Sequence, residues 1–165
     1  MVAATAVALE EYLATHFEHD AEWVDGEVIQ RPMPTMSHAE TQGRLFELTP
    51  RQFGGSPVRR GVELRVNTGD RYRVIDFAAY AGDWPGDVPT TPPLIAAEVL
   101  SEDESMSKLV DKLEEYRTWG VRHCWVLDPI HRQLYFYDNA LRPATVLSAP
   151  EIGLEIGAAA IWEAC

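Results

Sequence analysis

The segment Leu94-Ile95-Ala96-Ala97-Glu98-Val99-Leu100 is an almost continuous apolar run that contains a single acid. An apolar run of this length without polar alternation is typical of a strand that is buried on both faces. A carboxylate inside such a strand is energetically costly unless it is paired or binds a cation. The segment therefore predicts the centre of a sheet and, at Glu98, a candidate functional site.

A helix is predicted directly after this strand. Its apolar residues recur at helical spacing: Met106, Leu109, Val110, Leu113 and Tyr116. At 100° per residue, Lys112 lies at the margin of this apolar stripe, and Lys108 lies further round the helix. Lys112 can therefore reach back towards the strand, although an ordinary lysine that covers apolar surface is the commoner result of such a pattern. Asp111 and Glu115 are expected to face the solvent.

A second acid interrupts another apolar strand, at Asp76 in Val74-Ile75-Asp76-Phe77-Ala78. If the two strands are neighbours, the carboxylates of Asp76 and Glu98 lie close together, and two like charges at that distance cannot both stay ionised unaided. A divalent cation resolves the conflict, and hard carboxylate oxygens suit Mg²⁺ or Mn²⁺. The alternative is that one or both acids point outward or pair with an arginine.

The remaining segments predict the elements around these two strands. An amphipathic helix is expected at residues 6–17, and Asp25-Gly26 predicts a tight hairpin turn. Ser37, with Glu40 three residues later, predicts the start of a helix at residues 38–52 in which Pro50 ends the regular part. Further strands are expected at residues 58–66, 71–80, 123–128, 133–137 and 144–147. This order predicts one α/β (α+β) domain over residues 1–165, with a mixed β-sheet flanked by helices.

Length and composition suit a globular protein. The 165 residues are 46% apolar, and no stretch is long and apolar enough to predict a membrane helix or a signal peptide. Two cysteines make neither a disulfide framework nor a zinc site, and Cys124 in an apolar strand is expected to be a core thiol. A cytoplasmic protein without a membrane segment is therefore expected.

The net charge of −12 disfavours nucleic-acid binding, but the charge is unevenly distributed. Residues 41–75 hold seven arginines and three acids, whereas the rest of the chain holds seven basic and twenty-three acidic residues. This segment is either a solvated hairpin that uses arginine or an anion-binding patch on an acidic molecule.

Two further polar residues are candidates near the acids. His38 stands at a predicted helix start, and Glu22 begins a predicted hairpin strand. Each is either an accessory group or additional metal ligand, or an ordinary capping or surface residue. Tyr116 and Trp119 are expected in the core, and His123 and His131 at strand edges.

An Asp on one strand, a Glu on the next and a nearby Lys resemble the PD-(D/E)XK nuclease superfamily. Within it, the chain resembles the Uma-type restriction endonuclease family, once catalogued as a domain of unknown function, from about Leu9 to Tyr137. These segments carry the resemblance: Glu22-Trp23-Val24-Asp25-Gly26-Glu27-Val28, His38, Arg73-Val74-Ile75-Asp76-Phe77-Ala78, Glu98-Val99-Leu100-Ser101, Asp111-Lys112-Leu113-Glu114-Glu115-Tyr116, Gly120-Val121 and Trp125-Val126-Leu127-Asp128-Pro129.

The resemblance implies a restriction-endonuclease-like core with an N-terminal helix and β-hairpin. It also implies metal-binding acids at Asp76 and Glu98, and a catalytic lysine moved from the strand, where Leu100 stands, to Lys112 on the helix. Glu22 and His38 become accessory residues. Three departures are Ile75 in place of proline before the Asp, an acidic segment at residues 102–107, and Lys108 where relatives often carry Asp.

The expected function is a Mg²⁺- or Mn²⁺-dependent endonuclease with DNA as partner. Its nucleic-acid contacts are expected at Arg59, Arg60 and Arg73. Two alternatives stay open: a non-catalytic binding protein on the nuclease fold, and a metal-dependent hydrolase of a small phosphoester. A homodimer is also expected, because duplex cleavage needs two sites and the apolar segment Ala158–Trp162 needs a covering surface.

Overall fold

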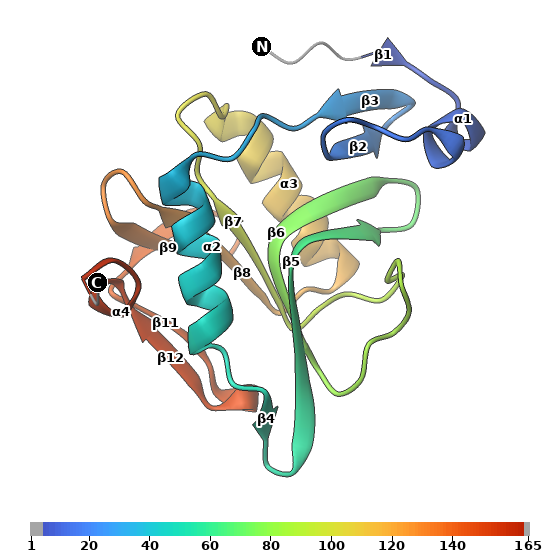
Figure 1. The fold of residues 1–165 in the computed structure, drawn as a ribbon. Coiled ribbons are helices and arrows are strands. Elements are labelled where there is room, and N and C mark those ends of the chain that lie inside the picture. The colour runs from blue at the N-terminus through green and yellow to red at the C-terminus, as the bar shows by residue number, and fades with distance from the viewer. Residues whose placement is uncertain (1–4, 164–165) are drawn as a thin grey trace.

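A ten-stranded mixed sheet runs through the computed structural model, which describes residues 5–163 (Figure 1). Its strands are β1 (Thr5–Ala6), β2 (Ala21–Val24), β3 (Glu27–Gln30), β4 (Gln52–Phe53), β5 (Ser56–Asn67), β6 (Tyr72–Ala81), β7 (Ile95–Val99), β8 (His123–Asp128), β9 (Gln133–Tyr137) and β10 (Leu141–Ala144). A second sheet pairs β11 (Val146–Ala149) with β12 (Leu154–Gly157). The helices are α1 (Leu9–Ala14), α2 (Met36–Leu48), α3 (Met106–Trp119) and α4 (Ala158–Trp162), with a short 3₁₀ turn, η1, at Pro150–Ile152.

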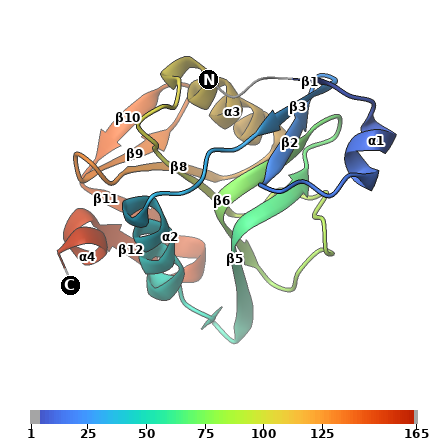
Figure 2. The same ribbon diagram turned by 45° about the horizontal axis from the view of Figure 1, so that its top comes forward.

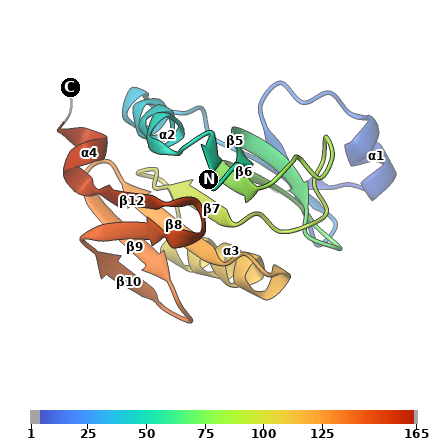
Figure 3. The same ribbon diagram turned by 90° about the horizontal axis from the view of Figure 1, so that it is seen from below.

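The predicted central strand lies where the sequence placed it. Every residue of β7 is buried, and β7 pairs antiparallel with β6 and parallel with β8, to which α3 connects it. Helix α3 covers one face of the sheet, and α2 with α4 covers the other (Figure 3). None of the helices in residues 5–163 combines the length and the apolar composition that a membrane crossing requires.

Strand β6 has an interrupted edge, and this interruption creates the space for a site. Tyr72 pairs with β5 on one side and with Trp23 of β2 on the other. Further along, Phe77 pairs with β5 and with Ala97 of β7. Strands β2 and β7 thus share one edge of β6 but diverge, and residues 73–76 between them have no strand partner on that edge. Figure 2 shows the β2–β3 hairpin beside one end of β5 and β6.

Two local predictions are wrong by a few residues. Helix α2 begins at Met36, and its N-cap is Thr35, not Ser37, because the Thr35 side chain accepts a hydrogen bond from the His38 backbone N–H. The strand predicted at residues 58–66 is longer, β5 at Ser56–Asn67, and Glu63 within it has a φ of 49°, which breaks the regular alternation of faces along the strand. As a result Val62 is exposed while Val66 is fully buried.

The end of the chain differs more from the prediction. The strand expected near residues 144–147 is two strands, because β10 ends at Ala144 on β9 and β11 begins at Val146 on β12. Helix α4 packs on α2, where Trp162 Nε1 donates to Thr41 Oγ1 over 3.1 Å and Ile161 is buried. The apolar segment expected to need a partner copy is therefore covered within the chain.

Packing of α3 on the sheet gives a first test. Leu113 of α3 is fully buried, so Leu113→Ala is expected to lower the free energy of unfolding by about 2–5 kcal/mol through lost burial and the cavity left behind. Met106 begins the same helix but is half exposed, so Met106→Ala is expected to change it by only about 0.5 kcal/mol. Urea denaturation measures both, and equal losses would contradict this packing.

Glu151 of η1 ties the C-terminal sheet to the start of β8 and gives a pH test. Its carboxylate contacts His123 Nε2 at 2.9 Å and Arg122 at 3.1 Å. Burial acts to raise the pKa of Glu151, but hydrogen bonds from its own backbone N–H, His123 and Arg122 lower it to about 2. Because the folded-state pKa is depressed, this stabilisation is present above the ordinary carboxyl pKa and is lost as pH falls towards 2.

Glu151→Gln is therefore expected to be less stable than the parent at about pH 5.5 and to approach it as pH falls to about 3. Urea denaturation across this range measures the difference. Glu155→Gln is the matched control, because Glu155 on β12 is exposed and makes no ion pair among the described residues. A difference for Glu151→Gln that stays constant with pH would refute the assignment.

Candidate active site

A cleft of about 1020 Å³ opens at the interrupted edge of β6. Its walls come from the β2–β3 hairpin, the Arg31–Thr35 strap that leads to α2, the loop after β7 and the first turns of α3. Five residues that the sequence singled out line it together: Asp76, Glu98, Lys112, Glu22 and His38. Residues up to 90 positions apart in the chain thus share one cleft.

The Asp76 carboxylate is almost completely buried and receives three contacts. The Val99 backbone N–H donates to Oδ2 over 2.7 Å, and His38 Nε2 lies 3.3 Å from the same oxygen. The Arg31 guanidinium bonds to Oδ1. Burial acts to raise the pKa of Asp76, but the His38 hydrogen bond and the Arg31 charge hold it below its usual range.

The Glu98 carboxylate is equally buried on the neighbouring strand. It accepts hydrogen bonds from the Tyr116 hydroxyl over 2.8 Å and from Lys112 Nζ over 3.0 Å. Burial is the largest influence and raises the pKa of Glu98 to about 8, against the opposing charge of Lys112. Two nearby acids whose pKa values move in opposite directions are typical of a functional site.

Lys112 is not the surface lysine that the helical pattern alone favoured. Its ammonium is buried and lies 2.9 Å from Glu22, 3.0 Å from Glu98 and 3.0 Å from the Val74 carbonyl oxygen. Glu22 in turn accepts the Val74 N–H over 3.0 Å. Both backbone groups of Val74, on the interrupted edge of β6, are therefore bonded by these two side chains. Burial opposes the lysine charge, but Glu22 and Glu98 raise the pKa of Lys112.

Arg31 is the main residue that sequence reasoning did not assign to the site. Its guanidinium bridges Asp76 and Glu63, with 2.5 Å between Nη1 and Glu63 Oε2. Gln42 of α2 completes this corner, donating to Glu63 and to the Asp76 carbonyl oxygen. An arginine partner for Asp76 was one of the open alternatives, but no spacing indicated which arginine it would be.

Of the three arginines expected to contact nucleic acid, only Arg73 lines the cleft. It is buried and paired with Glu22 and Glu115, so each of its three nitrogens already donates to a carboxylate. The same pair corrects the prediction that Glu115 faces the solvent. Arg73 is therefore a structural partner of these two acids in this cleft.

Arg59 and Arg60 lie outside the cleft. In the pairing of β5 with β6 they stand opposite Tyr80 and Ala79, whereas Asp76 lies nearer the other end. Arg59 is exposed and pairs with Asp83, and Arg60 donates to the Thr49 carbonyl oxygen over 2.6 Å. The structure therefore does not bring these two side chains to the acids.

Residues 9–154 match the family described as "Uma2: Putative restriction endonuclease". The chain belongs to the Uma2 family. A comparison with curated proteins gives no match. The Uma2 match extends past Tyr137, where the sequence resemblance ended, and takes in β10 and β11.

Among solved structures, the chain is similar to a crystal structure described as "a putative nuclease belonging to DUF820" from Anabaena variabilis. The TM-score is 0.80 at 20% sequence identity, over 95% of this chain and 98% of the other. At this identity the likeness establishes the fold. The predicted mixed sheet flanked by helices is thereby confirmed.

Charge in the cleft of this Uma2 protein is predominantly negative. Nine acidic side chains line it against four Lys or Arg side chains, three of which, Arg31, Arg73 and Lys112, are already paired with carboxylates. The acidic loop at Glu102, Asp103 and Glu104 forms part of the wall. A cleft of this kind favours cations over anions.

The donor set fits a hard divalent cation such as Mg²⁺. Asp76 and Glu98 supply carboxylate oxygens from adjacent strands, and both are shielded from water. Residues 5–163 contain no ready-made cluster of three His, Cys, Asp or Glu side chains for a metal. At Asp76 Oδ1, a cation would have to replace the Arg31 guanidinium.

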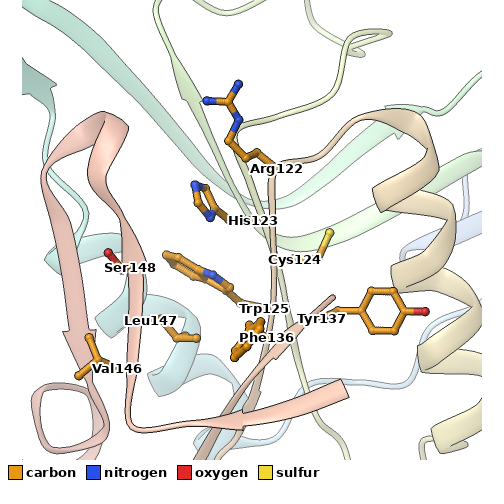
Figure 4. Close-up of a pocket in the computed structure, with 9 residues that line it drawn as sticks. All are labelled: Arg122, His123, Cys124, Trp125, Phe136, Tyr137, Val146, Leu147 and Ser148. Carbon is orange, nitrogen blue, oxygen red and sulfur yellow. The ribbon is translucent and has the colours of Figure 1, made fainter. Parts of the chain in front are cut away.

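A second, smaller cavity of about 230 Å³ lies beside β8 and contains none of these groups. Figure 4 shows Trp125 and His123 on one side of it and Val146 and Ser148 on the other. The His123 ring is held by Glu151, and the cavity holds no carboxylate pair. We therefore place the candidate site in the larger cleft.

The Tyr116 hydroxyl offers a test of the Glu98 environment. Tyr116→Phe leaves a buried carboxylate with one hydrogen-bond donor fewer, and we expect the free energy of unfolding to fall by about 1–3 kcal/mol. Tyr135→Phe is the control, because the Tyr135 hydroxyl makes no hydrogen bond within residues 5–163 and the ring is only partly buried. Urea denaturation without metal compares them, and an unchanged Tyr116→Phe variant would argue against this hydrogen bond.

Proposed function

We propose that this Uma2 protein is a Mg²⁺- or Mn²⁺-dependent endonuclease that hydrolyses nucleic-acid phosphodiester bonds. One observation carries the proposal: two buried carboxylates on adjacent strands, Asp76 and Glu98, open with Lys112 into one cleft. The Uma2 match and the nuclease-like fold support the same reaction class.

Asp76 and Glu98 are the proposed metal ligands. A bound divalent cation would lower the pKa of a water molecule and neutralise charge on the scissile phosphate. The Val99 N–H and His38 hold the Asp76 carboxylate in place, and Tyr116 does the same for Glu98. These contacts fix the carboxylates before substrate arrives, which limits reorganisation during the reaction.

Lys112 is the proposed catalytic cation. Its ammonium lies 3.0 Å from Glu98 and keeps its charge because two carboxylates face it. From this position it can orient the attacking water and stabilise the negative charge that develops on the oxygens of the scissile phosphate. Glu22 positions Lys112 by holding its ammonium at 2.9 Å.

The acidic lining of the cleft favours a second candidate, a metal-dependent hydrolase of a small phosphoester. Duplex DNA brings many phosphates to a surface, whereas a small substrate brings one or two, so negative charge around the site opposes it less. A panel of duplex DNA, RNA and a generic phosphodiester, each with Mg²⁺ and with Mn²⁺, distinguishes the two proposed activities.

The proposed homodimer is tested separately, by measuring the molecular mass of the protein in solution.

Substitution of the proposed ligands and lysine tests the reaction. We expect Asp76→Ala to abolish Mg²⁺-dependent plasmid nicking, and Lys112→Ala to slow it by about 10²–10³-fold. Asp111→Asn is the matched control, since Asp111 precedes Lys112 but is exposed on α3. Single-turnover nicking rates compare the variants, and circular dichroism establishes that each is folded.

If Asp76→Ala nicks plasmid DNA at the parent rate, the site assignment is wrong. If the folded parent cleaves no member of the panel with either metal, the enzymatic proposal fails and a binding protein on the nuclease fold replaces it. Preference for the generic phosphodiester over both nucleic acids supports the second candidate.

A further inference from the structure

We propose that Arg31 is an internal substitute for the metal: its guanidinium occupies the cation position at Asp76, leaves that oxygen when a divalent cation binds, and then contacts the substrate phosphate. The inference rests on the proposed function for its last step only. The exchange between guanidinium and metal stands on the geometry of the cleft.

The first observation is that Asp76 requires a cation at Oδ1. Its side chain is 1% exposed, and an unpaired carboxylate at that depth is strongly destabilising. Arg31 supplies the charge with one end of its fork and holds Glu63 with the other. The burial that makes Asp76 a suitable metal ligand thus also makes a counter-ion necessary when no metal is present.

The second observation is that Arg31 is the only one of the three Asp76 contacts that can leave easily. Val99 belongs to the central strand and His38 to the first turn of α2, so both are fixed by regular structure. Arg31 begins a strap whose next four side chains are exposed. Its backbone N–H stays bonded to the Asp20 carbonyl oxygen, so rotation of the side chain alone frees Asp76 Oδ1.

The third observation concerns where the displaced guanidinium goes. The cleft has four Lys or Arg side chains, and both Arg73 and Lys112 are held between two carboxylates. Arg31 is also held between two carboxylates, but once displaced it keeps Glu63 alone. The displaced Arg31 and the exposed Lys108 are therefore the two that can meet an anion. Glu63 keeps the displaced side chain near the site, and a guanidinium fork matches two phosphate oxygens better than an ammonium does.

The test is a Mn²⁺ titration of the full chain in which the rise in melting temperature reports metal binding. In chelator, we expect Arg31→Met to melt at a lower temperature than the parent, because Asp76 has lost its counter-ion. With Mn²⁺, we expect the variant to reach half-saturation at a metal concentration about tenfold lower or more, because the metal no longer competes with a guanidinium. Arg142→Met is the matched control, because Arg142 is exposed on β10 and outside the cleft, and it should titrate like the parent.

A second variant keeps the proposal testable if Arg31→Met does not fold, and added guanidinium ion tests the position itself in a folded Arg31→Ala chain. Glu63→Gln removes the carboxylate that holds the displaced guanidinium but leaves Asp76 its partner, so Arg31 should leave Asp76 less readily and Mn²⁺ binding should weaken severalfold. In Arg31→Ala, millimolar guanidinium ion should weaken Mn²⁺ binding by refilling the position, whereas equimolar urea should not. The parent should not respond to guanidinium at that concentration.

Unchanged or weaker Mn²⁺ binding in Arg31→Met, or unchanged or tighter binding in Glu63→Gln, would overturn the exchange. Tighter binding in Arg31→Met without cleavage of any substrate by any chain would support the exchange while the proposed function fails. If the parent cleaves and Arg31→Met cleaves equally fast at saturating metal, the phosphate-contacting step is wrong.

Discussion

A carboxylate buried inside a sheet must have a cation beside it, and the rest of this structure is arranged around that requirement at Asp76. The strand that carries it is paired on one edge by β5 and left open on the other between β2 and β7. Through that opening the strap, α2 and β7 each bring one group to the carboxylate. Without the Asp76 carboxylate, all three groups would lose their shared hydrogen-bond partner.

The second network, around Lys112, shows how the same contacts serve stability and chemistry. Glu22 and Lys112 bond both backbone groups of Val74, which otherwise would be buried without partners where the ladder is interrupted. The same ammonium faces Glu98. A lysine held this way is pre-positioned by the fold, so its proposed catalytic placement requires no additional ordering when substrate binds.

The sequence was informative wherever one periodic pattern carried the information. Six apolar residues around Glu98 predicted the buried strand, and helical phase distinguished Lys112 from the exposed Lys108. It was uninformative where the outcome depends on contacts across the fold. Arg31 pairs with an acid 45 residues away, and the positive φ of Glu63 that turns β5 has no local glycine signal. The C-terminal helix looked unpartnered because its partner, α2, lies more than 100 residues earlier.

Electrostatics then constrains what this cleft can accept. With every carboxyl group counted as ionised, nine acids against four Lys or Arg side chains give a formal excess of five negative charges around the proposed site, and Arg59 and Arg60 lie outside the cleft. One divalent cation reduces that excess to three, and a guanidinium freed from Asp76 redistributes charge without changing the total. Under the proposed function, this balance favours binding of the metal before a polyanionic substrate, because the metal adds positive charge where the phosphate would lie. The order of cation before substrate would then follow from the charge of the cleft and would hold for any phosphodiester.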